Sequence, residues 1–219
     1  RSTGLSNRNV RVLVASNQAQ SASLTFAGTA GGVFRSSDQG SNWQAVNNGL
    51  PNLDVRALAF SFPLRTLLAG TPAGVFRSID SGATWGALNS GLPTLHVRSV
   101  VFNGEHAYVG TDSGVFHLAP GNSAWVPFSN GLTNPDVRTM GRAGTTFCIG
   151  TGTVLFSLQS FVSNPAWIPA SGVPVAEVRS LAVSAGIPDR TGDGVLAGTD
   201  SGVFWGYPYG FAWTVINEG

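Results

Sequence analysis

The clearest hydrophobic pattern in the chain covers residues 55–89, where short apolar runs alternate with turn residues. The runs are rich in Val, Leu, Phe or Trp, are bounded by Gly, Pro, Asn or Ser, and cover residues 55–60, 65–70, 74–78 and 85–89. Such short runs are typical of β-strands, and no segment shows the sustained period of a helix. The pattern therefore predicts four short antiparallel strands in this stretch.

The same arrangement returns five times along the chain. A glycine precedes a phenylalanine by six residues in every repeat, at Gly28, Gly70, Gly110, Gly150 and Gly198. The phenylalanines recur at intervals of 40 to 48 residues, at Phe34, Phe76, Phe116, Phe156 and Phe204. A tryptophan follows each of them, at Trp43, Trp85, Trp125, Trp167 and Trp213. Four strands per repeat of this length predict an all-β, five-bladed β-propeller of four-stranded antiparallel blades.

The ends of the chain fit whole repeats. Gly4-Leu5 aligns with Gly49-Leu50, and residues 213–219 align with residues 43–49. We expect a single propeller domain over residues 1–219, with blades at about residues 5–49, 50–91, 92–131, 132–172 and 173–219. We expect the ring to close blade against blade, without a strand shared between the two ends. A larger propeller cut at a repeat boundary would show the same pattern.

Composition narrows the classes of partner. The 219 residues are 42% hydrophobic, which is enough for a substantial core, and carry a formal net charge of +1. This charge gives no reason to expect a nucleic-acid partner. No stretch approaches the ~20 apolar residues of a membrane span. The single cysteine, Cys148, lies in an apolar run and predicts a buried free thiol. The absence of lysine and the low charge suggest a secreted, periplasmic or cell-surface protein.

A turn motif carries a family resemblance. Residues 78–85 read Ser-Ile-Asp-Ser-Gly-Ala-Thr-Trp, and residues 36–43 read Ser-Ser-Asp-Gln-Gly-Ser-Asn-Trp. This Ser-x-Asp-x-Gly-x-Thr-Trp pattern after Gly-Val-Phe-Arg resembles the Asp-box, or bacterial neuraminidase repeat, propellers. That family includes sialidases, xyloglucan-cleaving glycosidases, sortilin-type receptors and proteins like photosystem assembly factors. Only the first two repeats have the full box; the other three keep the Trp and lose the Ser and Asp.

The box itself has a structural interpretation. An Asp in a tight turn accepts hydrogen bonds from backbone N–H groups, Gly takes a positive φ, and the Trp fills the gap between sheets. We favour this role for Asp38, Asp80 and the repeat tryptophans over a sugar-binding platform. The resemblance to sialidases implies a Tyr–Glu nucleophile pair, but none of Tyr108, Tyr207, Tyr209, Glu105, Glu177 and Glu218 forms a recognisable pair in the sequence. Hydrolase activity is therefore the less favoured interpretation.

The most regular polar feature is an arginine rim, in which one arginine follows a valine at the start of each first strand: Arg11, Arg56, Arg98, Arg138 and Arg179. These positions repeat around the axis of a propeller and could bind a carboxylate, a phosphate or an acidic partner loop. Acids precede three of them by two residues, at Asp54, Asp136 and Glu177. Two interpretations stay open: ion pairs that neutralise the rim, and an anion or partner site.

Aromatic residues form the second candidate surface. Trp205, Tyr207, Tyr209 and Phe211 fall where other repeats have a small polar turn, and Phe161 lies in the elongated turn of the fourth repeat. Exposed aromatic side chains often anchor protein interfaces or stack on sugars. The alternative is that these rings cover the seam between the last and first blades.

The longest loop offers a metal site. Asp189, Thr191 and Asp193 partly match the alternating oxygen ligands of a calcium loop. A polar hairpin turn explains the same residues, so no cofactor is expected apart from this Ca²⁺ candidate. Taken together, the sequence predicts a non-catalytic binding or scaffolding propeller that recognises another protein. The alternative is a carbohydrate-binding or glycosidase-like propeller.

Overall fold

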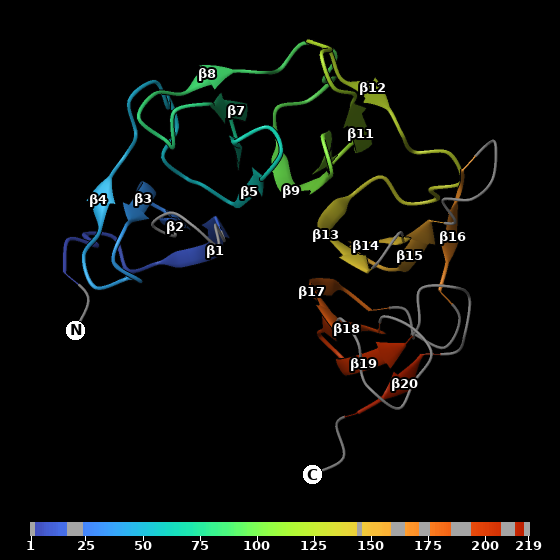
Figure 1. Ribbon diagram of the computed structural model, residues 1–219. Helices are drawn as coiled ribbons and strands as arrows, with labels where there is room; N and C mark the ends of the chain where they lie inside the picture. The colour runs from blue at the N-terminus through green and yellow to red at the C-terminus, as the bar shows by residue number, and fades with distance from the viewer. Residues whose placement is uncertain are drawn as a thin grey trace. The chain divides into compact units, whose positions relative to one another are not determined.

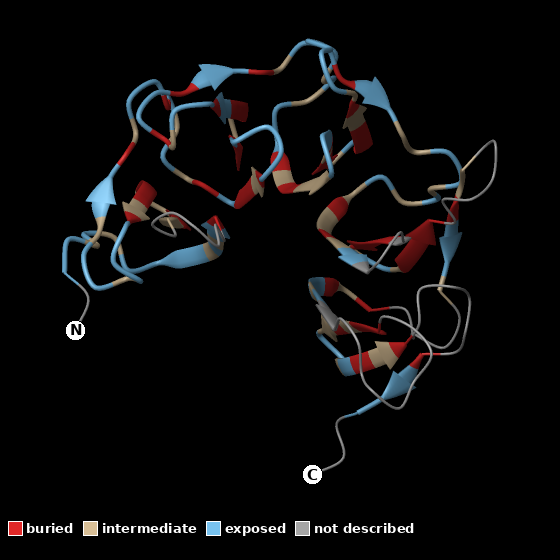
Figure 2. Cartoon of the chain, viewed as in Figure 1, coloured by how far each residue is buried: buried red, intermediate tan, exposed pale blue. Residues whose placement is uncertain are grey.

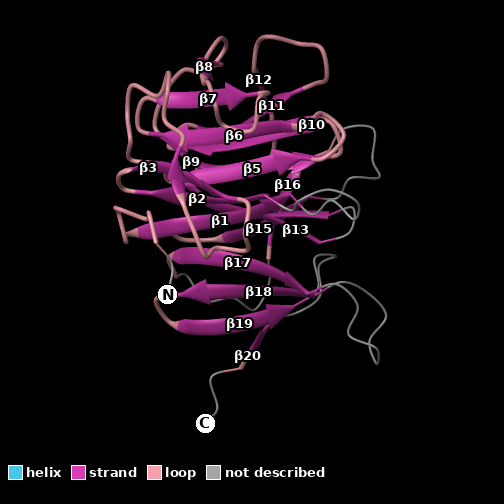
Figure 3. Ribbon diagram, turned by 60° about the vertical axis from the view of Figure 1, so that its left-hand side comes forward, coloured by secondary structure: helices cyan, strands magenta, loops and turns pink. Residues whose placement is uncertain are grey.

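The computed structural model describes residues 3–16, 24–143, 146–158, 165–170, 176–184, 194–206 and 213–216. These residues form twenty strands, and no helix occurs among them, so none of them builds a helix that could cross a membrane (Figure 3). The strands make five antiparallel four-stranded sheets, each ordered from its first strand to its fourth (Figure 1). The fold is a β-propeller of five blades, as the repeat predicts.

Each blade uses four consecutive strands. Blade 1 contains β1 (Val10–Ser16), β2 (Leu24–Thr29), β3 (Gly32–Ser36) and β4 (Gln44–Ala45). Blade 2 contains β5 (Ala57–Ser61), β6 (Thr66–Thr71), β7 (Gly74–Ser78) and β8 (Gly86–Ala87). Blade 3 contains β9 (Val97–Asn103), β10 (His106–Thr111), β11 (Gly114–Leu118) and β12 (Val126–Pro127). Blade 4 contains β13 (Val137–Ala143), β14 (Thr146–Thr151), β15 (Leu155–Leu158) and β16 (Trp167–Pro169). Blade 5 contains β17 (Val178–Ser184), β18 (Gly194–Thr199), β19 (Gly202–Gly206) and β20 (Thr214–Val215).

The chain divides into two compact units. The first contains Arg1–Val109 and Phe116–Val126, and the second contains Gly110–Val115 and Pro127–Gly219. In both units the second strands are largely buried, whereas the fourth strands β4, β8, β12 and β20 are exposed (Figure 2). β8 is shorter than the strand predicted over residues 85–89, and it begins after Trp85, which is buried.

The Gly-Thr pair at the end of each second strand closes a tight turn. In blade 2, the Thr71 hydroxyl donates to the Gly74 carbonyl at 3.2 Å and accepts from the Ala73 N–H at 3.0 Å. Gly74 has φ +115°, where only glycine is unstrained. In the other blades the equivalent threonine hydroxyl also donates to the carbonyl three residues later: Thr29, Thr111, Thr151 and Thr199. The repeated Gly-Thr therefore terminates a strand and is part of the scaffold.

The glycine of that pair also sets the distance between neighbouring blades. A Cβ added at Gly70 would lie 2.7 Å from Val97 Cγ1, and one added at Gly28 would lie 2.8 Å from Val55 Cγ1. In the second unit, a Cβ added at Gly110 would lie 2.5 Å from Val137 Cγ1, and one added at Gly150 would lie 2.4 Å from Val178 Cγ1. All four of these valines are fully buried. Each inner interface therefore fits a valine of one blade into the space above a glycine of the blade before it.

The repeat tryptophans join the same neighbours. The Trp85 indole N–H donates to the Val46 carbonyl of blade 1 at 2.8 Å, and the Trp85 backbone N–H donates to the Asn48 carbonyl at 2.9 Å. Trp125 donates to Leu88, and Trp167 donates to Phe128, through the same indole group. Trp43 differs, since its indole donates to Gly40 in its own turn. The predicted structural role of these tryptophans is confirmed.

Replacement of Trp85 by alanine tests this role. Trp85 is 6% exposed, so we expect Trp85→Ala to lower the free energy of unfolding by about 3–5 kcal/mol through a buried cavity and a lost hydrogen bond between blades. Denaturant unfolding followed by circular dichroism measures the change. Trp43→Ala is the matched control and should cost clearly less, because Trp43 is only half-buried. Equal losses in the two variants would contradict the joining role.

Candidate functional site

The Ser-x-Asp turns of blades 1 and 2 have the geometry that the sequence predicts. In blade 2, Asp80 accepts from the Thr84 N–H at 2.9 Å and from the Thr84 hydroxyl at 2.5 Å, and the Ser78 hydroxyl donates to it at 2.7 Å. Gly82 has φ +87°. The Thr84 hydroxyl, the Thr84 N–H and then Ser78 lower the pKa of Asp80 to about 2. The carboxylate is occupied in holding its turn, so it is unsuited to cutting a substrate.

Blade 3 replaces this turn with an apolar one. Leu118 stands where blade 2 has Ser78, and Pro120 stands where blade 2 has Asp80. Leu118 is 8% exposed and belongs to the core between blades 2 and 3. The sequence shows that blade 3 has lost the box. It does not show that this loss leaves an arginine of blade 2 without a hydrogen-bond acceptor in the turn of blade 3.

That consequence appears at two equivalent arginines, Arg35 of β3 and Arg77 of β7. Arg35 donates from Nη1 to the Ser81 carbonyl in the box turn of blade 2 at 3.1 Å, and from Nη2 to Gln44 at 3.3 Å. Arg77 is exposed, and its side chain has no hydrogen bond or ion pair among the described residues. One arginine therefore ties two blades together, and its counterpart is available to a ligand.

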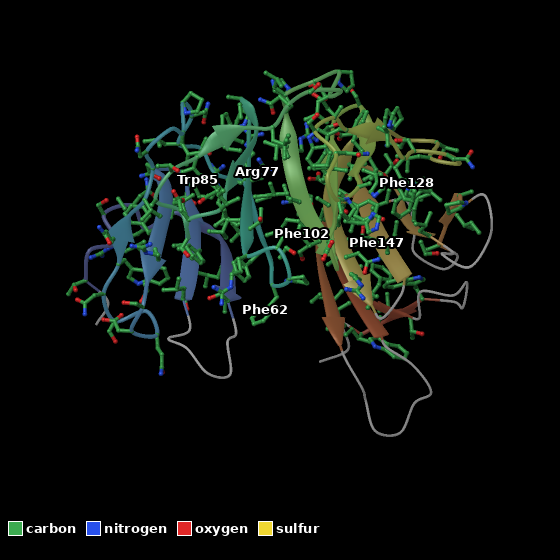
Figure 4. The ribbon with its side chains drawn as sticks, turned by 45° about the horizontal axis from the view of Figure 1, so that its top comes forward. Phe62, Arg77, Trp85, Phe102, Phe128 and Phe147 are labelled. Atoms are coloured by element: carbon green, nitrogen blue, oxygen red, sulfur yellow. The ribbon has the colours of Figure 1, made fainter. Side chains whose placement is uncertain are left out.

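A groove opens beside Arg77, between blades 2 and 3 of the first unit. Its lining is mainly apolar, with Arg77 and Glu105 as the charged members, and includes Leu64, Leu68, Leu88, Phe102, Leu118 and Pro120. Figure 4 labels Arg77 and Phe102 on these two blades, together with Phe62, which is 52% exposed on the β5–β6 turn. Leu64 of the lining is itself 40% exposed.

A second cluster on blade 3 was also missed by the sequence analysis. His106 Nδ1 lies 2.8 Å from His117 Nε2, and the His117 ring stacks on Tyr108 with ring centres 4.8 Å apart. Burial, followed by the charge of His106, lowers the pKa of His117, and burial raises the pKa of Tyr108. Two imidazoles do not complete a metal site, and no group of three or more His, Cys, Asp or Glu side chains placed to hold a metal occurs in the described part of the chain.

In blades 2 and 3, the rim arginines Arg56 and Arg98 stand where the first strand begins, whereas Arg77 and Leu118 of the groove stand at the opposite end of the sheet, where the third strand ends. A β-bulge falls at Arg11, Arg138 and Arg179, where each first strand begins, and bulges re-aim the side chain they carry. The preceding loop is held by a short turn, since the Asp54 N–H donates to Asn52 Oδ1 at 2.8 Å and the Asp136 N–H donates to Asn134 at 3.0 Å.

Acids of the rim pair within their own blade and with the blade before. Asp54 pairs with Arg56 at 3.0 Å and with Arg11 of blade 1. In the second unit, Glu177 pairs with Arg138 of blade 4 and, at 3.7 Å, with Arg179. Asp136 pairs with Arg138 at 2.9 Å and is the main cause of the raised pKa of Arg138. The expected Asp-x-Arg pairs are confirmed, and the sharing of one acid between two blades is new.

The acid that precedes the rim arginine is not present in every blade. In the first unit, Arg11, Arg56 and Arg98 occur with one acid, Asp54, because Asn9 and His96 hold the other acid positions. In the second unit, Arg138 and Arg179 occur with Asp136 and Glu177. The acid two residues before the arginine is thus present in blades 2, 4 and 5 and replaced in blades 1 and 3.

The remaining predicted residues are placed only in part. Trp205 lies half-buried on β19, opposite Leu196 of β18. Tyr207, Tyr209, Phe211 and Phe161 lie outside the described residues, as do Asp189, Thr191 and Asp193 of the calcium candidate. Cys148 is buried, as predicted, and burial raises its pKa to about 12.

Comparison with known proteins identifies the fold. No protein-family model matches the sequence, and no curated protein is similar to it. Among solved structures, the extracellular domain of a putative hybrid two-component system from B. thetaiotaomicron is 20% identical, with a TM-score of 0.72 over 96% of this chain and 28% of that one. The chain therefore spans about 28% of that neighbour's length.

Two further neighbours have other roles. The GH74 xyloglucanase from Xanthomonas campestris is 17% identical, with a TM-score of 0.69 over 95% of this chain and 38% of that one. YCF48 from Cyanidioschyzon merolae is 16% identical, with a TM-score of 0.63 over 89% of this chain and 69% of that one. At these identities the likeness shows a shared fold, on which several different functions occur.

The pKa of Asp80 provides a test of the turn chemistry. Thr84→Val removes the hydroxyl that contributes most to the shift, so the pKa of Asp80 should rise from about 2 toward 3.8. A carboxyl pKa that is lower in the folded than in the unfolded state adds stability above pH 3.8, and this stability is lost as the pH falls toward 2. Thr84→Val should therefore weaken the dependence of stability on pH in that window. Carboxyl NMR titration measures the pKa, Thr94→Val is the control, and an unchanged Asp80 pKa would contradict this account.

Proposed function

We propose that this chain is a non-catalytic protein-binding propeller of the Asp-box family that works outside the cytoplasm. The hydrogen-bonded Ser-x-Asp turns of blades 1 and 2 support the family. An extracellular sensor domain among the structural neighbours, together with the absence of lysine, supports the location. YCF48, a small neighbour that the chain covers to 69%, supports a propeller used without a large attached enzyme.

The groove between blades 2 and 3 carries the proposal. It combines an apolar floor with an exposed guanidinium and one carboxylate, and it lies where blade 3 departs from the repeat. Apolar contacts supply most of the affinity of such a site, and the charged groups fix the orientation of the ligand. An extended segment of a partner protein fits this chemistry, with an apolar side chain against Phe102 and Leu118 and a carboxylate on Arg77.

The carboxylates support a binding role over a hydrolytic one. A glycosidase needs two carboxyl groups about 5–10 Å apart and available to the substrate. Among the described residues, Asp38 and Asp80 hold turns, whereas Asp54, Asp136 and Glu177 pair with arginines. Asp112 and Asp200 accept hydrogen bonds from the neighbouring serines in the turns between second and third strands. Glu105 is the described carboxylate that lines the groove, and it has no carboxylate partner there.

Carbohydrate binding remains the second candidate function. The repeat tryptophans Trp85, Trp125, Trp167 and Trp213 are at most 6% exposed, so they offer no platform for a sugar ring. The half-buried Trp205 is the described member of the aromatic surface, which stays a prediction. The arginine rim also stays a prediction as a partner site, since four of its five arginines already take part in ion pairs: Arg11, Arg56, Arg138 and Arg179.

A peptide-selection experiment tests the groove. We expect peptides selected from a random display library against the whole chain to share an apolar residue next to an acidic one. Arg77→Ala should weaken their binding about ten-fold, the equivalent of roughly 1.4 kcal/mol, as measured by calorimetry. Arg8→Ala, which removes another exposed arginine, is the control and should leave the affinity unchanged.

A second variant rebuilds the missing turn. Leu118→Ser with Pro120→Asp restores the Ser-x-Asp order in blade 3 and removes two apolar walls of the groove. It should abolish peptide binding while the chain stays folded. Peptide binding that survives both changes would overturn the groove. Glycan-array binding that is lost in Trp205→Ala, with no selected peptide, would favour the carbohydrate function.

A further inference from the structure

The interface between blades 1 and 2 shows how the repeat closes the place where the groove lies. Phe26 stands opposite Arg35 in the register of β2 and β3, and it is 0% exposed. The box turn of blade 2 packs on this ring, since a Cβ added at Gly82 would lie 3.7 Å from Phe26 Cε1 and 3.1 Å from Val46 Cγ2. Arg35 fastens the same turn through the Ser81 carbonyl. A ring, a turn and an arginine therefore close this interface together.

These closing elements have changed between blades 2 and 3. Leu68 stands opposite Arg77 in the register of β6 and β7, where blade 1 has the phenylalanine. Asn122 takes the place of Gly82 and is exposed, whereas Gly82 is buried. A Cβ added at Gly121 would meet none of the described residues within 4 Å. The turn of blade 3 therefore leaves the groove open, and all the residues that line it belong to the first compact unit.

Two opposite charges line this groove without neutralising each other. Arg77 belongs to β7, the third strand of blade 2, and Glu105 lies in the turn between β9 and β10 of blade 3. Both side chains are exposed, and neither has a hydrogen bond or an ion pair within the described part of the chain. A cation and an anion thus stand on opposite walls of a groove whose lining is otherwise mainly apolar.

We propose that the groove selects a dipolar segment of a partner protein, in which an acidic residue lies on one side of an apolar residue and a basic residue lies on the other. This inference rests on the proposed function of the groove and adds the charge pattern of its ligand. The acid pairs with Arg77 and the base pairs with Glu105, while the apolar side chain contacts the lining. Complementary charges of this kind set the specificity and the orientation of a bound segment more than its affinity.

Other charge patterns fit the two walls less well. A ligand with acidic groups alone would place a carboxylate beside Glu105, and like charges brought together across an interface oppose binding. A neutral ligand would withdraw both charged groups from water without giving either of them a partner. The dipolar segment satisfies both walls, so the groove should prefer it to either alternative.

A directed peptide library tests this charge pattern. Each displayed peptide carries a fixed central Leu, and its flanking positions are drawn from Asp, Lys, Ala and Gly. Selection against the whole chain should enrich peptides with Asp on one side and Lys on the other by about ten-fold over peptides with charges of one sign. Selection against the double variant Arg77→Ala, Glu105→Gln should remove this preference.

Calorimetry with one selected peptide assigns the base to Glu105. Replacing the Lys of the peptide by Ala should weaken its binding to the whole chain about three-fold, as expected for an exposed ion pair. The same replacement should leave binding to Glu105→Gln unchanged, because that variant lacks the carboxylate. Asp112→Asn is the control: it removes a carboxylate of the same blade outside the groove lining and should preserve the loss.

Exchange of the two charges gives a second test at constant net charge. The double variant Arg77→Glu, Glu105→Arg, with its fold checked by circular dichroism, should prefer the peptide in which Asp and Lys have changed places. Selected peptides with charges of one sign or none, or a preference that the exchange leaves unaltered, would overturn the dipolar ligand and leave the protein-binding groove intact. Failure of Arg77→Ala to weaken any selected peptide would instead refute the proposed function itself.

Discussion

The close fit between one blade's glycine and the next blade's valine is the constraint on which the rest of the structure depends. A four-stranded sheet this small cannot bury enough apolar surface by itself, so its core must lie against a neighbouring sheet. A single Cβ at Gly70 would intrude on Val97, which leaves glycine as the residue that permits this spacing. The buried clusters accordingly join residues of two blades, such as Ala57 with Val109 and Cys148 with Phe204.

This constraint separates the scaffold from the candidate binding sites. The residues that recur in every repeat, Gly-Thr, Val-Phe and Trp, close turns, fill interfaces and link blades by hydrogen bonds. Departures from the repeat change what a blade presents to its neighbours. The exchange of Ser and Asp for Leu118 and Pro120 removes the polar turn of blade 3. It coincides with an Arg77 side chain that has no hydrogen bond or ion pair within the described part of the chain. The departures at Asn9 and His96 likewise remove the acid that precedes the rim arginine in other blades, and Arg11 pairs with Asp54 of blade 2 instead.

Much of the fold could be predicted from sequence because its signals are local and repeated. Strand runs, turn glycines and the Asp-x-Arg pairs each depend on residues a few positions apart. The groove could not be predicted in this way, since it depends on whether an arginine of one blade reaches the turn of the next, as Arg35 does and Arg77 does not. The bridging of Arg11 and Arg56 by Asp54 depends on the spacing between blades for the same reason. The calcium loop and most of the aromatic surface lie outside the described residues and stay predictions.

A double-mutant cycle at one inner interface tests the central constraint most directly. Gly70→Ala should destabilise the chain by about 1–3 kcal/mol, because the added methyl group meets Val97 at 2.7 Å. Val97→Ala removes that obstacle, so the double variant should be more stable than the sum of the two single effects predicts, by about 1 kcal/mol or more. The free energies of unfolding of the four proteins give this coupling. Additive effects within error would show that the glycine and valine do not set the spacing between blades.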